Sequence, residues 1–198
     1  MEKQPIEVGR RIAVWGVTGS GKTTLSQRLA AILGVGVVEL DAIRHARGWD
    51  STDWPEFRAV LSERLDSMPE GWVVEGSYSA IMDVYLSRID TMVWIHLPFR
   101  TSFWRLLKRT IPRGIKQTQL YTPTGPHESI RQSFFSRQSI LWFALKSHPE
   151  AATRRRTRIA VLPPHVHVYE LRSPREVEVF VQAVQWQVSR TTAAQETI

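Results

Sequence analysis

The chain has 198 residues, no cysteine, and 26 Lys and Arg against 19 Asp and Glu, which gives a formal net charge of +7. This length suits one domain with a substantial core, and the absence of cysteine excludes disulfides and cysteine-ligated zinc. The sequence shows neither the apolar core of a signal peptide nor an apolar run of about 20 residues, so we expect a cytoplasmic protein with no membrane contact. The basic balance suits anionic ligands such as nucleotides, and it equally suits nucleic acid.

The most specific motif lies near the N-terminus. An apolar run predicts a buried strand over about 10–15, and apolar residues at helical spacing predict a helix over about 22–33. Between them lie Gly16 and, after four further residues, the run GKT at 21–23, which together match the phosphate-binding pattern G-x-x-x-x-G-K-[ST]. The pattern therefore stands between a strand and a helix, which is the context that nucleotide binding requires.

The residue types in this loop have chemical reasons. Glycines let several backbone N–H groups converge on one phosphate chain, and the N-terminus of the following helix adds positive partial charge. We expect Lys22 to reach the β- and γ-phosphates and Thr23 to place its hydroxyl on Mg²⁺. An ordinary glycine-rich turn is the alternative, and the presence of Lys22 and Thr23 disfavours it. The residues expected to bind the nucleotide phosphates are Gly16, Thr18, Gly19, Ser20, Gly21, Lys22, Thr23 and Thr24.

Strand and helix patterns alternate along the rest of the chain. We predict further strands over about 35–40, 72–74, 92–97 and 166–171. We predict helices from a capping box at Asp53 and Glu56, over about 79–87, 99–110 and 128–146, in a piece that runs to about 160, and from a capping box at Ser173 and Glu176. A loop over 42–51, an irregular stretch over 111–127, a loose lead-in over 1–9 and a disordered tail from Thr191 complete the chain.

This alternation predicts a single α/β domain, spanning 1–198, with a parallel sheet. We expect its core over about 10–98 and 165–190, and a lid-like helical region over about 99–160. In such sheets, ligands bind beyond the carboxyl ends of the strands. The phosphate-binding pattern and the charged residues discussed next all fall at those ends.

Two predicted strands end in a carboxylate, at Asp41 and at Glu75. Phosphoryl transfer needs a carboxylate near Mg²⁺, directly or through water, and it can also need a base for the hydroxyl that accepts the phosphoryl group. Either residue could serve in either role. The alternative interpretation is that each acidic residue only caps a strand end or the turn that follows.

Several arginines could neutralise the migrating phosphoryl group. Arg44 follows Asp41 by three residues, and Arg105 and Arg109 are four apart, so they share one face of a helix. Guanidinium groups suit this task because they bind phosphate oxygens in a forked geometry. Any one of them could instead be a solvated surface arginine. A second basic group, at Arg154, Arg155, Arg156 and Arg158, would suit either a nucleic-acid face or a solvated surface.

The chain resembles the adenylate-kinase-like branch of P-loop kinases, and more closely the topology-modulation (FlaR-like), adenylate-kinase-related ATP-binding proteins of bacteria. The resemblance covers about 11 to 182, and its carriers are GVTGSGKTTL, VVELDAIRHARGWD, WVVEGSYS, FWRLLKRTIPRG and LRSPREVEVF. It implies a three-layer αβα fold, a five-stranded parallel sheet in the order 2-3-1-4-5, and ATP with Mg²⁺ as cofactors.

The same resemblance implies roles for individual residues. Glu75 resembles the acidic residue that holds Mg²⁺ through water, and Asp41 and Arg44 resemble the Asp-x-x-Arg of the acceptor site. Arg105 and Arg109 resemble the arginines that flank the lid. The turn at Arg172 and Ser173 would border the adenine, as the turn before the last helix does in such proteins.

One departure bears on the acceptor. Nucleoside monophosphate kinases carry Phe-Pro-Arg after the Asp-Gly pair, whereas here Gly76 is followed by Ser-Tyr-Ser, with no arginine. We therefore expect an ATP- and Mg²⁺-dependent phosphotransferase whose acceptor is a small hydroxyl-bearing metabolite or an unusual nucleotide, acting as a monomer or homodimer. The alternatives are an ATP-dependent regulator that binds nucleic acid and a nucleotide-binding module without catalysis.

Overall fold

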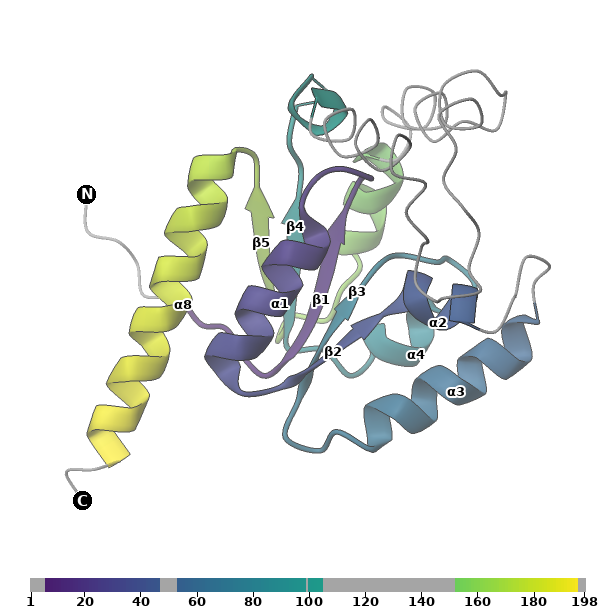
Figure 1. Cartoon of the computed structure of the whole chain (residues 1–198), viewed down its shortest axis with the longest axis horizontal. Coiled ribbons are helices and arrows are strands. Elements are labelled where there is room, and N and C mark those ends of the chain that lie inside the picture. Colours follow the sequence, from purple (N-terminus) through teal and green to yellow (C-terminus); the bar gives the residue numbers. More distant parts are fainter. Residues whose placement is uncertain (1–5, 47–52, 99, 105–151, 196–198) are drawn as a thin grey trace, which may run out of the picture.

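The computed structural model describes residues 6–46, 53–98, 100–104 and 152–195 (Figure 1). Five parallel strands form one sheet in the order β2-β3-β1-β4-β5, as predicted. The strands are β1 (Arg11–Gly16), β2 (Gly36–Glu39), β3 (Trp72–Glu75), β4 (Thr91–Ile95) and β5 (His167–Leu171).

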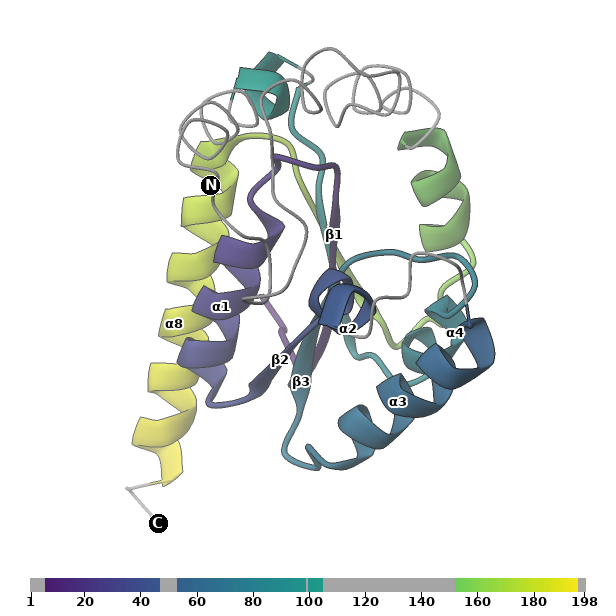
Figure 2. The ribbon, with the colours of Figure 1, turned by 45° about the vertical axis from the view of Figure 1, so that its right-hand side comes forward.

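Helices cover both faces of the sheet, which gives three layers (Figure 2). Together α1 and α8 lie on one face, and α3 and α4 lie on the other. The labelled helices are α1 (Lys22–Leu33), α2 (Leu40–Ala46), α3 (Trp54–Asp66), α4 (Met82–Leu86) and α8 (Pro174–Gln195). Two further helical stretches, 100–104 and 152–159, border the part of the chain outside the described residues. The described part therefore has the predicted αβα architecture.

The central strand β1 shows how the sequence builds two cores. Side chains alternate between the faces of a strand, so Ile12 and Val14 join the cluster beneath α1 and α8, while Ala13 and Trp15 join the cluster beneath α3 and α4. All four are completely buried. The Trp15 indole N–H donates to the Tyr85 hydroxyl at 3.1 Å, which satisfies its one polar atom. A central strand buried on both faces holds the loop that follows it in a fixed place.

The predicted loop over 42–51 is wrong for its first part, because α2 follows β2 without a break. Leu40 is completely buried and Ile43 packs against the same core. Leu40 and Ile43 are three residues apart, which places them on the same face of a helix, and their packing holds this face of the short helix against the sheet. As a result Asp41 lies in the first turn of a helix, and not at a strand end as predicted.

The described parts of the predicted loose lead-in and disordered tail, 6–9 and 191–195, are ordered. Val8 is 4% exposed, and its backbone N–H and carbonyl pair with the amide of Gln187 at 2.9 and 2.7 Å. These bonds fasten the lead-in to α8, which continues past Thr191 to Gln195. Ser173 is confirmed as the N-cap, since the Glu176 N–H donates to Ser173 Oγ at 3.1 Å, while the Glu176 carboxylate accepts from the backbone N–H of Arg172 at 2.9 Å. No helix within the described ranges is long and apolar enough to cross a membrane.

Candidate active site

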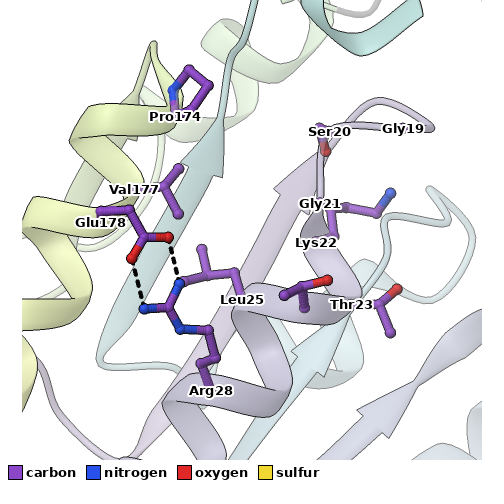
Figure 3. A pocket seen from close by; sticks show the side chains of 11 residues that line it. Gly19, Ser20, Gly21, Lys22, Thr23, Leu25, Arg28, Pro174, Val177 and Glu178 are labelled. Atoms are coloured by element: carbon purple, nitrogen blue, oxygen red, sulfur yellow. Dashed lines mark hydrogen bonds and ion pairs between the residues drawn. The ribbon is translucent and has the colours of Figure 1, made fainter. Parts of the chain in front are cut away.

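The phosphate-binding loop joins β1 to α1 at the carboxyl edge of the sheet (Figure 3). Gly21, immediately before α1, has φ 95°, a backbone conformation that other residues rarely adopt. Gly16 has a different reason: a Cβ there would lie 2.4 Å from Ser20 Oγ. Both glycines are therefore required by the shape of the loop, which leaves the N-terminus of α1 open toward a ligand.

Lys22 lies against the end of β3. Its Nζ is 3.8 Å from Glu75 Oε1 and donates to the Val17 carbonyl at 3.3 Å. The side chains of Lys22 and Glu75 are only 15% and 8% exposed. The Thr23 hydroxyl is close enough to Glu75 to lower the pKa of that carboxyl. The structure thus brings together the predicted phosphate-binding lysine, the predicted metal-binding hydroxyl and the predicted metal-supporting carboxylate.

A third acidic residue, which the sequence analysis did not single out, lies beside this group. Glu39 ends β2 and is paired in register with Glu75, which ends β3. Burial raises the pKa of Glu75, Lys22 lowers it, and the nearby charges of Glu39 and Asp41 raise it further. The strand ends therefore gather negative charge around one lysine. Glu39 was not singled out from the sequence because the predicted strand ends one residue later, at Leu40, with Asp41 as the carboxylate that follows.

This arrangement fits Mg²⁺. Within the described ranges, no cluster of three or more acidic or histidine side chains could hold a metal by itself. Mg²⁺ does not need such a cage, because it keeps several waters and usually takes only one or two carboxylates together with substrate phosphates. Thr23 and Glu75, with Glu39 beside them, would supply the protein's share of the ligands, directly or through water.

A second cluster lies on α2, α3 and the segment after β3. The Tyr78 hydroxyl donates to Asp41 Oδ1. The Arg44 guanidinium lies over two aromatic rings, 5.2 Å from the centre of Tyr78 and 5.9 Å from that of Trp54. Those two rings are 6.0 Å apart and pack together with Phe57. Asp41 and Arg44, predicted to bind the acceptor, are thus close together and share Tyr78 as a neighbour.

Arg155, from helical stretch 152–159, approaches the phosphate-binding loop from the other side. Its Nη2 donates to the Gly16 carbonyl at 3.3 Å, while its buried Nε has no hydrogen-bond partner among the residues that the structure describes. Burial lowers the pKa of Arg155, and the charges of Arg154 and Arg158 lower it further. A half-buried guanidinium in this position is suited to an anion held by the loop.

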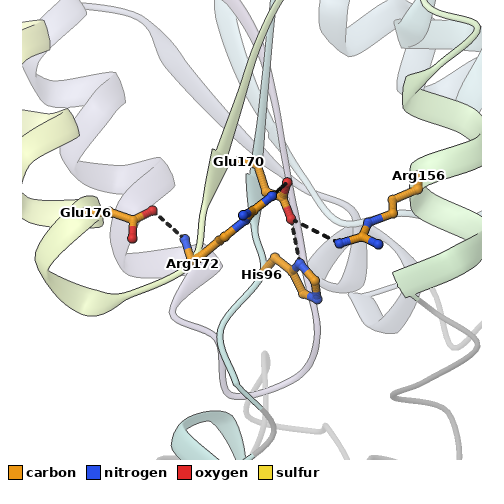
Figure 4. Close-up of polar contacts among 5 residues, drawn as sticks. All are labelled: His96, Arg156, Glu170, Arg172 and Glu176. Carbon is orange, nitrogen blue, oxygen red and sulfur yellow. Dashed lines mark hydrogen bonds and ion pairs between the residues drawn. The ribbon is translucent and has the colours of Figure 1, made fainter.

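The four arginines of this group do not all face the solvent. Arg155 faces the loop, and Arg158 donates to Met82 Sδ at 3.2 Å. Arg156 lies over the Trp94 ring and 3.9 Å from Glu170 (Figure 4). Arg155 and Arg158 therefore contact the body of the domain, while the Arg156 side chain is 62% exposed.

A hollow of about 470 Å³ extends from the loop along α1 and α8 (Figure 3). Its lining includes Thr24, Pro174 and Val177, and the Arg28–Glu178 ion pair, with an N–O distance of 2.6 Å, closes one end. Arg172, predicted to border the adenine, is not among the lining residues. Its guanidinium pairs with Glu170 at 2.7 Å, and Glu170 in turn bonds to His96 at 2.6 Å (Figure 4).

Two predicted lid arginines, Arg105 and Arg109, lie outside the described residues. Their roles stay predictions. Thr18 lies in the turn of the phosphate-binding loop, as its place in the motif requires.

Replacing Glu75 with glutamine should stabilise the free protein. Because burial raises the pKa of Glu75, its charge weakens the folded chain in full above the folded-state pKa, and the penalty shrinks below that value and disappears below the unfolded-state pKa. At neutral pH we expect Glu75→Gln to add on the order of 1 kcal/mol to the free energy of unfolding, or about 2–4 °C in Tm. Thermal denaturation over a pH series measures this difference, which should shrink on acidification.

Glu178→Gln is the matched control. Its partner Arg28 lowers the pKa of Glu178, so its charge favours the folded chain above its unfolded-state pKa. This variant should therefore not be stabilised, and its Tm at neutral pH should equal that of the parent or lie below it. A Glu75→Gln variant that melts below the parent at neutral pH would contradict the electrostatic interpretation of the cluster.

Comparison with known proteins supports the fold. No protein-family model matches the chain, and no curated protein matches it. Among solved structures, a gluconokinase from Sinorhizobium meliloti 1021 is 20% identical, with 97% of this chain and 98% of that one covered and a TM-score of 0.50. A shikimate kinase from Bacteroides thetaiotaomicron is 17% identical, with 91% of this chain and 98% of that one covered and a TM-score of 0.53. A shikimate kinase from Acinetobacter baumannii is 14% identical, with 93% of this chain and 96% of that one covered and a TM-score of 0.52. The chain therefore has the fold of P-loop kinases.

Proposed function

We propose that this protein is a Mg²⁺- and ATP-dependent phosphotransferase that phosphorylates a small hydroxyl-bearing metabolite or an unusual nucleotide. One observation carries the proposal: Asp41 and Arg44 lie at the same edge of the sheet as the Lys22–Glu75 pair, and the charge of Asp41 raises the pKa of Glu75. A site that only bound nucleotide would not need this second polar cluster beside the phosphates. Assignment to the adenylate-kinase-like, topology-modulation branch rests on the sequence resemblance.

One set of residues would bind ATP and its metal, and another would bind the acceptor. Lys22 binds the β- and γ-phosphates, and Arg155 adds positive charge at the Gly16 side of the loop. Thr23 and Glu75 hold the metal, which neutralises phosphate charge when it is bound. The hollow between α1 and α8 takes the nucleoside. Arg105 and Arg109 remain proposed ligands of the transferring phosphoryl group.

Asp41 serves the acceptor. The acceptor oxygen attacks the γ-phosphorus, the bond from that phosphorus to the β–γ bridging oxygen breaks, and ADP leaves. The proton of the acceptor hydroxyl passes to the Asp41 carboxylate. Arg44, held over Trp54 and Tyr78, places a cation beside this carboxylate, where it can bind a polar or anionic group of the acceptor.

Asp41→Asn tests this assignment. We would follow transfer of the γ-phosphoryl group from radiolabelled ATP to gluconate, shikimate, nucleosides and nucleoside monophosphates, and in parallel its release to water. The parent should transfer to at least one of these classes. Because a general base contributes about 10²–10⁴-fold, Asp41→Asn should lower transfer by about that factor and leave ATP binding intact.

Asp66→Asn, at the last residue of α3, is the control, since Asp66 pairs with Arg88 away from the loop. Equal transfer by the parent and by Asp41→Asn would exclude Asp41 as the base. An enzyme that binds ATP and transfers to none of these acceptors, but hydrolyses ATP faster with DNA or RNA, would favour the regulator instead.

A further inference from the structure

Tyr78 links the two charged residues of the acceptor cluster. Its hydroxyl donates to Asp41 Oδ1, and the Arg44 guanidinium lies over its ring, 5.2 Å from the ring centre. The nearby Arg44 cation also lowers the pKa of Tyr78, against the larger effects of burial and of Asp41. The phenol is therefore a shared neighbour of an anion from the first turn of α2 and of a cation one turn further along the same helix.

The surroundings of Tyr78 keep it in place. Its ring packs edge-on to Phe57, with the centroids 6.0 Å apart, and lies 6.0 Å from the ring of Trp54. Phe57 is 1% exposed and belongs to the core beneath α3 and α4. Because this packing involves the ring alone, removal of the hydroxyl should leave it unchanged.

We propose that Tyr78 is a positioning residue of the acceptor site, whose hydroxyl occupies one oxygen of Asp41 and so directs the other toward the acceptor. The inference rests on the proposed function. Asp41 stands on a helix of seven residues, and a short side chain on such a helix has more than one rotamer available. A hydrogen bond from a fixed phenol selects one of them, which places the base before the acceptor arrives.

The first test is Tyr78→Phe in the transfer assay, with the acceptor that the parent uses among gluconate, shikimate, nucleosides and nucleoside monophosphates. Loss of a hydrogen bond to a charged group should lower kcat for transfer by about 10- to 100-fold. The KM for ATP and the slow release of phosphate to water should change little, because neither depends on Asp41. The share of ATP lost to water should therefore rise.

A double-mutant cycle separates positioning from general packing. If Tyr78 acts through Asp41, then Tyr78→Phe should have little further effect on transfer in an Asp41→Asn background. Tyr169→Phe, in the edge strand β5, is the matched control, because its hydroxyl bonds to the backbone N–H and carbonyl of Glu7, both at 2.9 Å, and not to a side chain of the described residues. Its transfer rate should equal that of the parent. Unchanged transfer by Tyr78→Phe, or additive effects in the cycle, would overturn the inference and leave the proposed function standing.

A second test needs no acceptor. Burial and the charge of Asp41 both raise the pKa of Tyr78. Tyrosinate absorbance in the near ultraviolet, taken as the difference between the parent and Tyr78→Phe, should therefore appear only in strong alkali. In an Asp41→Asn background, the same difference should appear at lower pH, because the carboxylate no longer opposes ionisation. No downward shift would show that Tyr78 and Asp41 do not interact, and this would overturn the inference even if no acceptor were found.

Discussion

Lys22→Met should abolish phosphoryl transfer and leave the chain folded. Lys22 is the cation at the head of α1, and its Nζ lies 3.8 Å from Glu75 at the place where the phosphates are expected. Methionine keeps the length and apolar stem of the side chain but loses the charge that stabilises the migrating oxygens. Removal of such a group costs about 10²–10³-fold in kcat. Steady-state transfer and ATP hydrolysis both measure the loss.

The melting temperature of Lys22→Met, measured over a range of pH, tests whether Lys22 neutralises Glu75 in the folded chain. Lys22→Met leaves Glu75 buried without its cation, and the pKa of Glu75 is already raised by burial. Tm should therefore fall at neutral pH and recover as the pH is lowered and Glu75 becomes protonated. Arg64→Met, in the last turn of α3 and exposed, is the control and should match the parent in activity. Transfer at the parent rate by Lys22→Met would show that the donor site lies elsewhere.

The sequence predicts the fold well because its signals are local. The apolar run before Gly16 and the spacing of apolar residues after Thr23 are each sufficient to define β1 and α1, and the observed bounds differ from the predicted ones by about one residue. The sheet order came from the resemblance, and the structure confirms it. Boundaries failed where a strand runs directly into a helix, because at Leu40 the same buried residue satisfies both patterns.

The site was harder to predict because its contacts are long-range. Glu39 and Glu75 are neighbours only through the register of β2 with β3. Tyr78 meets Asp41 across 37 residues, and Arg155 meets Gly16 across 139. No spacing along the chain signals such pairs. The sequence could name the phosphate-binding residues, which are consecutive, but it could not distinguish an inward-facing arginine from its surface neighbours on one short helix.

Arg155 therefore carries the second large prediction. Arg155→Met should lower kcat for transfer by about 10²–10³-fold, as expected for a donor to the transferring group, with a smaller change in ATP affinity. Its guanidinium bonds to the phosphate-binding loop at the Gly16 carbonyl. Arg155→Lys should restore little of the loss, because an ammonium cannot reproduce the forked geometry of a guanidinium. Arg154→Met, the neighbouring exposed position, should transfer at the parent rate.

The direction of the stability change distinguishes a catalytic Arg155 from a structural one. In the described part of the chain its Nε has no hydrogen-bond partner, and burial lowers its pKa, so its charge weakens the free folded state. Arg155→Met should then raise Tm while it lowers activity, which is the combination expected where a strained functional group is removed. If Tm falls together with activity, Arg155 mainly supports the loop through the Gly16 carbonyl. Transfer and thermal denaturation, measured on the same preparations, decide between the two.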